Sequence, residues 1–163
     1  MQLYLTYGLF HLDDRGRRAV LHAFDGTKIE LEWRRGYAGA MAVVRAAHGL
    51  AREDVTIFLP SSTVDEVYKT DLLVRLSDGR YLCVQVKSRR EDLIGTRAHP
   101  LHAQSLLFLN DEAATTLRAM RAFGRRYNVR CVPVLIEIGN DRATPWGIQV
   151  QHLLPIFNPL YRL

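Results

Sequence analysis

The sequence predicts an α/β fold organised around one mixed β-sheet. A pair of apolar strands over residues 70–90 predicts the centre of the sheet, and apolar residues at helical spacing flank it, over 36–50 and through Leu117, Met120 and Tyr127. From 36 to 138 the expected order is helix, three strands, helix and strand. An N-terminal β-meander over 1–35 precedes this core, and a C-terminal strand and tail over 139–163 follow it. At 163 residues the chain predicts a single domain.

The N-terminal meander is expected because residues 2–33 alternate loosely between apolar and polar and contain two turn signals. Residues 13–16 form the first turn. Asp25-Gly26 is a strong hairpin signal between strands over 18–24 and 28–33. In the second of these strands the odd-numbered residues are apolar and would share one face, with Glu30 and Glu32 on the other.

The elements around the central strand pair are predicted from their boundaries. Gly49 suits the C-terminal end of the helix over 36–50, and Pro60 ends a short buried strand over 55–59. A polar loop is expected over 61–69 and a basic loop over 88–99. Pro100 would begin a helical segment to residue 109, and strands are expected over 129–138 and 146–151.

The turn of the central strand pair decides which side chains share a face. Leu72, Val74 and Leu76 alternate on the first strand, as do the even-numbered residues 82–86 on the second. A three-residue loop over 77–79 would place Asp71 directly opposite Gln85, whereas a two-residue loop would turn Asp71 away. Gly79 would then take the left-handed position of the loop.

Asp71, Gln85 and Lys87 form a polar set on this strand pair. An acid where a strand begins, followed by an oxygen ligand and a lysine two residues apart, suits metal-dependent cleavage of phosphodiester bonds. The pattern, together with the order of elements over 36–138, resembles the PD-(D/E)XK nuclease superfamily, whose restriction-endonuclease-like core has the order αβββαβ. This chain is a variant with Gln85 at the usual Asp or Glu position and Thr70 at the usual proline.

The resemblance implies a metal site and a reaction. Mg²⁺ (or Mn²⁺) would be bound by Asp71, the side-chain carbonyl of Gln85 and the backbone carbonyl of Val86. Asp65 and Glu66 are the nearest further acids, and we take Glu66 as the additional ligand. Lys87 would stabilise the charge that develops as water attacks the phosphorus in line.

The implied substrate is DNA, cut by a metal-dependent endonuclease. The resemblance also implies dimers or higher oligomers, since two strands have to be cut. Phosphates flanking the cleaved bond would be held by basic residues of the 88–99 loop and of the following helix, namely Arg89, Arg90, Arg97, Arg118 and Arg121.

Two other readings remain open. The first is a catalytically inactive form of the same fold that binds nucleic acid or a partner protein. The neutral Gln85 is the feature that favours it. The second is an unrelated α/β interaction domain in which the three residues coincide by chance. Mg²⁺-dependent cutting separates the nuclease from both.

Composition gives weaker guidance. The chain carries a net charge of +5, which suggests an anionic partner. Apolar content of 48% is typical of a globular protein, and no apolar run approaches the length of a membrane span. Cys83 and Cys131 fall within expected strands and are predicted to be reduced core residues. No signal peptide is apparent at the N-terminus, so we expect a cytoplasmic protein.

Overall fold

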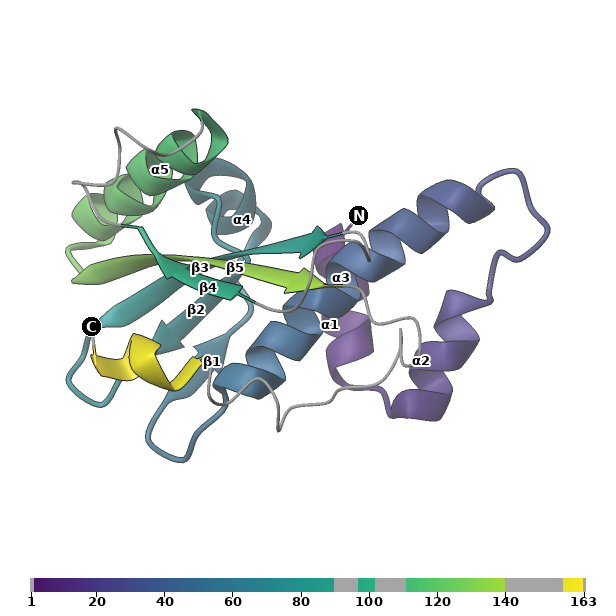
Figure 1. The fold of residues 1–163 in the computed structure, drawn as a ribbon, viewed down its shortest axis with the longest axis horizontal. Helices are drawn as coiled ribbons and strands as arrows, with labels where there is room; N and C mark the ends of the chain where they lie inside the picture. Colours follow the sequence, from purple (N-terminus) through teal and green to yellow (C-terminus); the bar gives the residue numbers. More distant parts are fainter. Residues whose placement is uncertain (1, 90–96, 102–110, 140–156, 163) are drawn as a thin grey trace.

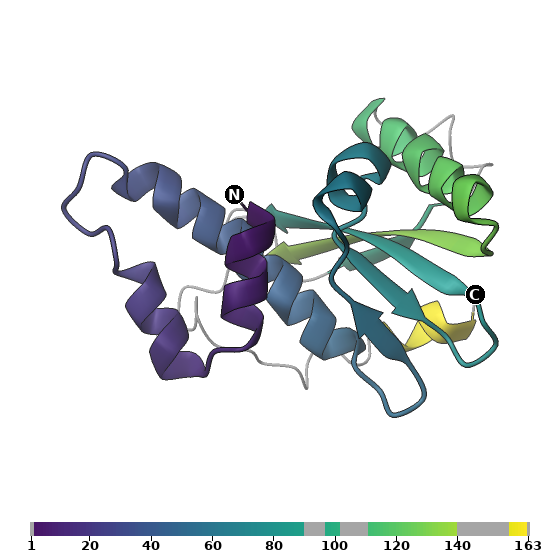
Figure 2. The same ribbon diagram turned by 180° about the vertical axis from the view of Figure 1, so that it is seen from behind.

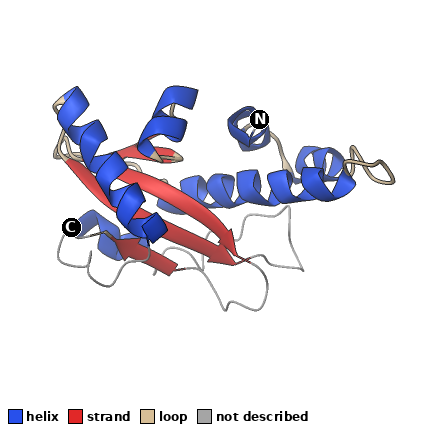
Figure 3. Cartoon of the chain, turned by 90° about the horizontal axis from the view of Figure 1, so that it is seen from above, coloured by secondary structure: helices blue, strands red, loops and turns tan. Residues whose placement is uncertain are grey.

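The structure is a computed structural model that describes residues 2–89, 97–101, 111–139 and 157–162. Within these ranges it contains a five-stranded mixed sheet in the order β1-β2-β3-β5-β4 (Figure 1). Helix α3 packs on one face of the sheet, and helices α4 and α5 pack on the other (Figure 3). The prediction of an α/β fold with one mixed sheet is therefore confirmed. None of the described helices is both long and apolar enough to span a bilayer.

The predicted N-terminal β-meander is wrong, because residues 1–35 contribute helices. α1 (Gln2–Phe10), α2 (Asp14–Leu21) and the start of α3 (Glu30–Leu50) occupy this region. The side chain of Asp13 accepts a hydrogen bond from Gly16 N at 2.7 Å and so caps α2. Asp25-Gly26 lies in the loop between α2 and α3 and joins two helices, not two strands.

Helical packing explains why these residues do not form strands. Leu9, Leu21, Tyr37, Met41 and Val44 are buried together in a cluster formed by α1, α2 and α3. Ile29 and Leu31, which a strand would have turned inward, are 45% and 63% exposed. α2 and the N-terminal part of α3 project beyond the sheet, whereas α1 lies against α3 (Figure 2).

The sheet combines an antiparallel meander with one parallel pair. β1 (Thr56–Phe58), β2 (Leu72–Arg75) and β3 (Tyr81–Arg89) follow one another antiparallel. β5 (Cys131–Gly139) then lies parallel to β3, and the connection between them contains α5 (Asp111–Tyr127). The helix within 36–50, the strand within 55–59, the central strand pair, the later helix and the strand within 129–138 are thus confirmed.

The sheet separates two apolar layers. Leu72, Leu82, Val84 and Ile136 are fully buried against the C-terminal half of α3. On the opposite face Cys83 packs with residues of α4 and α5, including Met120 and Phe123. Because side chains alternate along β3, Gln85 and Lys87 also lie on the face covered by α5.

Two segments expected to be loops contain regular structure. Residues 61–69 include α4 (Ser62–Tyr68), whose N-terminus is capped by Ser61 and whose Val64 is buried. The 88–99 segment includes part of β4 (Arg97–Pro100), which pairs antiparallel with β5. The expected start of a helical segment at Pro100 is wrong, because Pro100 ends β4 and pairs with Val134. The rest of that segment, from 102 to 109, and the expected strand over 146–151 lie outside the described residues.

The prediction of reduced cysteines is also wrong. Cys83 of β3 and Cys131 of β5 form a disulfide, with their Cα atoms 6.1 Å apart. Cys83 is paired with Pro133 across the two strands, so Cys131 lies two residues along the neighbouring strand on the same face. Adjacent strands thereby bring the two side chains within the ordinary Cα separation of a disulfide.

Candidate active site

The hairpin between β2 and β3 has the predicted three-residue loop. Leu72 pairs with Val84 and Arg75 with Tyr81, and Leu76 N donates to Arg80 O at 2.8 Å. Residues 77–79 therefore form the loop, and Gly79 has a left-handed backbone with φ of 83°. The paired residues end at Leu72 and Val84, and Asp71 lies in a bend directly before β2. The loop length is thus confirmed, whereas the expected pairing of Asp71 with Gln85 lies beyond the strand register and stays a prediction.

Asp71 lies where β2 begins and remains bound to β3. Its backbone N donates to Val84 O at 2.8 Å, and its Oδ2 accepts from Val86 N at 2.6 Å. In an antiparallel pair the N–H and C=O of one residue point to the same side of the strand. The carbonyl of Val86 is thus expected on the side occupied by the Asp71 carboxyl group, and its role as a metal ligand stays a prediction.

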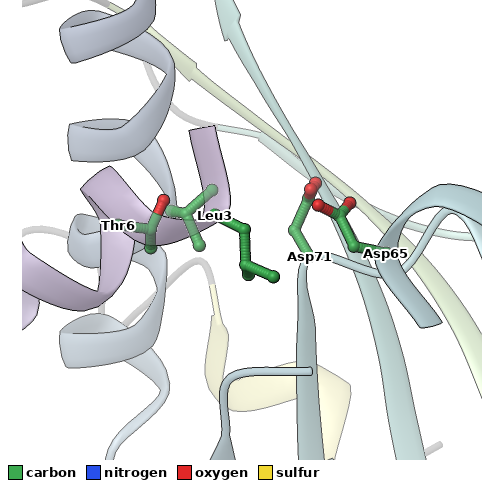
Figure 4. A pocket seen from close by; sticks show the side chains of 5 residues that line it. Leu3, Thr6, Asp65 and Asp71 are labelled. Atoms are coloured by element: carbon green, nitrogen blue, oxygen red, sulfur yellow. The ribbon is translucent and has the colours of Figure 1, made fainter. Parts of the chain in front are cut away.

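A second carboxyl group, from Asp65 of α4, lies beside Asp71 (Figure 4). Their side chains are hydrogen-bonded to each other. The chain between them turns back sharply, because Lys69 has a left-handed backbone with φ of 54° and Thr70 Oγ1 donates to Tyr68 O. Glu66, the acid expected as a metal ligand, is exposed on α4.

The environment of Asp71 favours its protonated form. Burial raises the pKa of Asp71 to about 7, and the neighbouring Asp65 adds to the increase. The Val86 N–H group and the positive charge of Lys87 oppose it. Burial also raises the pKa of Asp65. The two carboxyl groups therefore share a proton more readily than two exposed acids do.

The carboxyl pair opens into a small pocket whose other walls come from the N-terminal helices. Leu3 and Thr6 of α1 and Val43 of α3 line it together with Asp65 and Asp71 (Figure 4). Leu3 and Thr6 belong to the region expected to be a β-meander, so the sequence analysis did not anticipate their contribution. The spacing of three residues places both on one side of a helix once α1 is known.

Gln85 and Lys87 are both held by α5. Gln85 Oε1 accepts a hydrogen bond from Thr116 Oγ1 at 2.6 Å. Lys87 Nζ lies 2.6 Å from Glu112 Oε1. Thr116 is buried at 3% exposure, whereas the Lys87 side chain is 34% exposed and reaches the edge of the site. The sequence analysis missed Glu112 and Thr116, which are separated by one helical turn.

The predicted phosphate-binding residues are described only in part. Arg118 and Arg121 are exposed on α5, and Arg118 Nη2 donates to Thr115 Oγ1 at 3.2 Å. Arg89 and Arg97 belong to β3 and β4, but their side chains, and all of Arg90, lie outside the described part of the structure.

Among the described residues, the polar side chains next to Asp71 offer oxygen atoms as donors. Two carboxyl groups, the amide of Gln85 and the carbonyl of Val86 are hard donors of the kind that Mg²⁺ and Mn²⁺ prefer. No group of three or more His, Cys, Asp or Glu residues within the described ranges is arranged to hold a metal ion. A metal at this site would therefore depend on the amide and backbone oxygens as well as on the two acids.

Comparisons with protein families, curated proteins and solved structures found no match to this chain.

Proposed function

We propose that this protein is a metal-dependent nuclease of the PD-(D/E)XK type that hydrolyses phosphodiester bonds in DNA. The observation that carries the proposal is the contact between Asp71 and β3. The Asp71 carboxyl group accepts a hydrogen bond from Val86 N, and Gln85 and Lys87, the two neighbours of Val86, share one face of β3. Asp65, hydrogen-bonded to Asp71, supplies a second acid.

The order of elements supports the same proposal. α3, β1, β2, β3, α5 and β5 reproduce the sequence helix, three antiparallel strands, helix and parallel strand. This is the αβββαβ order that the resemblance to the superfamily implies. α4 and β4 are additions between these elements.

The donor set fits Mg²⁺ or Mn²⁺, with Asp71, Asp65 and the side-chain and backbone oxygens of Gln85 and Val86 as the ligands. When bound, such an ion would activate water and offset negative charge on the phosphate. Asp71 and Asp65 must be deprotonated to bind it, so binding would release the proton that the pair holds.

The basic side chains near the site have roles that follow from their positions. Lys87 projects from the same face as Gln85 and is partly exposed, so its ammonium group can reach a phosphate bound at the carboxyl pair. The exposed Arg118 and Arg121 of α5 would bind phosphates further along the DNA. Arg89, which ends β3, Arg97 of β4 and Arg90 would do the same.

The proposal is tested by incubating the protein with DNA in Mg²⁺ or Mn²⁺, beside EDTA. Metal-dependent cleavage is expected, and Asp71→Asn should abolish it because that change removes a charged ligand. Glu53→Gln, an exposed acid between α3 and β1, is the matched control and should cleave like the parent. Cleavage that persists in Asp71→Asn would reject the assignment.

A second candidate is a nucleic-acid-binding module without catalysis. Two contacts and one pKa favour it. Gln85 is hydrogen-bonded to Thr116, Lys87 is paired with Glu112, and the pKa of Asp71 is raised to about 7. Each of these involves a side chain that cleavage requires. Salt-sensitive DNA binding without cleavage at pH 8, where Asp71 should be charged, would select this candidate.

A further inference from the structure

The contacts of Gln85 and Lys87 have a common geometric origin. Thr116 and Glu112 are four residues apart on α5, a rise of about 6 Å along a helix. Gln85 and Lys87 are two residues apart on β3, about 6.6 Å along a strand. The two spacings nearly coincide, so one face of α5 meets successive side chains on one face of β3.

The two contacts differ in strength. Thr116 is 3% exposed and its hydroxyl group donates to Gln85 at 2.6 Å. A buried hydrogen bond of this kind fixes the orientation of an amide, because losing it leaves the carbonyl oxygen without its donor. The Lys87–Glu112 pair is more exposed, with side-chain exposures of 34% and 65%. Exposed ion pairs hold their partners more weakly.

The bond from Thr116 also determines which atom of Gln85 can act at the site. A carbonyl oxygen has two lone pairs. One accepts from Thr116, which leaves the other for a ligand. A carboxylate at position 85 would have two oxygen atoms, so either orientation would present an oxygen to a ligand. Gln85 has only one, so its orientation depends on the hydrogen bond from Thr116 more than that of an acid would.

We propose that Thr116 and Glu112 of α5 are positioning residues, which orient Gln85 and Lys87 toward the carboxyl pair of Asp65 and Asp71. This inference rests on the proposed nuclease function. In this proposal, α5 fixes the orientation of both Gln85 and Lys87.

The test is single-turnover cleavage of DNA by the full-length protein in Mg²⁺, with DNA binding measured in Ca²⁺. Thr116→Val removes the hydroxyl group and keeps the shape. It should slow cleavage by about 10-fold or more with unchanged binding. Thr116→Ser restores the hydroxyl group and should recover most of the rate. Thr56→Val, the same change at an exposed position of β1, is the control and should match the parent.

The contact with Lys87 is tested in the same assay. Glu112→Gln should slow cleavage by about 3-fold, less than Thr116→Val, because its ion pair is exposed. Asp111→Asn removes an acid from the same helical turn and is the matched control. Faster cleavage by Glu112→Gln would show that Glu112 restrains Lys87, and would overturn its assignment.

The remaining outcomes are distinguishable. A folded Thr116→Val variant that cleaves at the parent rate overturns this inference and leaves the nuclease proposal intact. The same holds if Thr116→Ser is as slow as Thr116→Val, since the hydroxyl group would then be irrelevant. A parent protein that does not cleave in Mg²⁺ or Mn²⁺ overturns both proposals. Thermal unfolding of each variant separates a lost contact from a lost fold.

Discussion

Asp71 combines burial with a close acidic neighbour, and both favour its neutral form. Its pKa is raised from 3.8 to about 7. Between these two pH values the folded protein holds a proton that the unfolded chain releases. The contribution of Asp71 to stability is therefore complete below about pH 4 and is lost as the pH rises through 7.

This linkage gives a prediction that requires no metal. Asp71→Asn replaces the carboxyl group by a neutral amide. The free energy of unfolding of this variant should therefore not show the decrease that Asp71 causes in the parent as the pH rises. Relative to the parent, the variant should gain stability between pH 5 and pH 8. Urea unfolding in EDTA at the two pH values measures the difference. Glu53→Gln controls for the change in net charge, and an Asp71→Asn difference that is flat with pH would contradict the assigned pKa.

At the scale of an element, the hairpin loop explains how the sequence specifies the register between β2 and β3. A loop of three residues fixes the register, and the register fixes the face, because side chains alternate with a period of two. Gly79 makes this loop possible, since its φ of 83° is unfavourable for residues with a Cβ atom. Nothing lies within 4 Å of the position that a Cβ atom would occupy there.

Gly79→Ala should therefore destabilise the protein through the backbone alone, by about 1 kcal/mol. Gly8→Ala is a matched contrast. Gly8 is also free of atoms within 4 Å of a Cβ position but lies within α1, where alanine should stabilise by up to about 1 kcal/mol. Chemical denaturation of both variants measures the two changes. Equal effects of the same sign would contradict the role of the loop.

Periodicity and turn signals were insufficient to predict the helices of residues 1–35. Leu5 and Leu9 are four residues apart, a spacing that places them on one face of a helix and also on one face of a strand, so their periodicity does not decide between the two. Gly26 does have a left-handed backbone, with φ of 74°. A turn signal of this kind shows where the chain reverses but leaves open whether the elements that it joins are helices or strands.

In the candidate site, too, some features follow from local sequence rules and others depend on the packing of distant elements. The three-residue loop was predicted from the sequence, and the shared face of Gln85 and Lys87 follows from alternation along β3. Asp65 and Thr116 approach the site through packing of α4 and α5 on the sheet. This approach depends on contacts between residues distant in the chain, such as Thr116 with Gln85. The exposed position of Glu66, next to Asp65, depends on how α4 is rotated about its axis, and residues 61–69 were expected to form a loop.

At the scale of the whole molecule, the net charge of +5 and the exposed arginines of α5 predict salt-sensitive DNA binding. On duplex DNA the affinity should fall with a log–log slope of about −0.9 for each phosphate contact. Arg118→Ala and Arg121→Ala should each reduce the magnitude of the slope by about 0.9. Arg35→Ala, on the projecting part of α3, should leave it unchanged. Binding titrations at several salt concentrations measure the slopes, and a flat salt dependence of the parent would favour a protein-binding domain.

The central claim is that Asp71, Gln85 and Lys87 together perform phosphodiester cleavage. Lys87→Ala tests it most directly, because Lys87 is partly exposed and its removal should leave the core intact. Single-turnover cleavage in Mg²⁺ is measured with saturating protein, beside DNA binding in Ca²⁺, and Lys28→Ala in the exposed loop before α3 is the control.

The account predicts that Lys87→Ala binds DNA nearly as well as the parent but cleaves it about 100-fold more slowly or worse, since the lost charge acts in the transition state. Weakened binding with an unchanged single-turnover rate would contradict the account and reduce Lys87 to a phosphate contact.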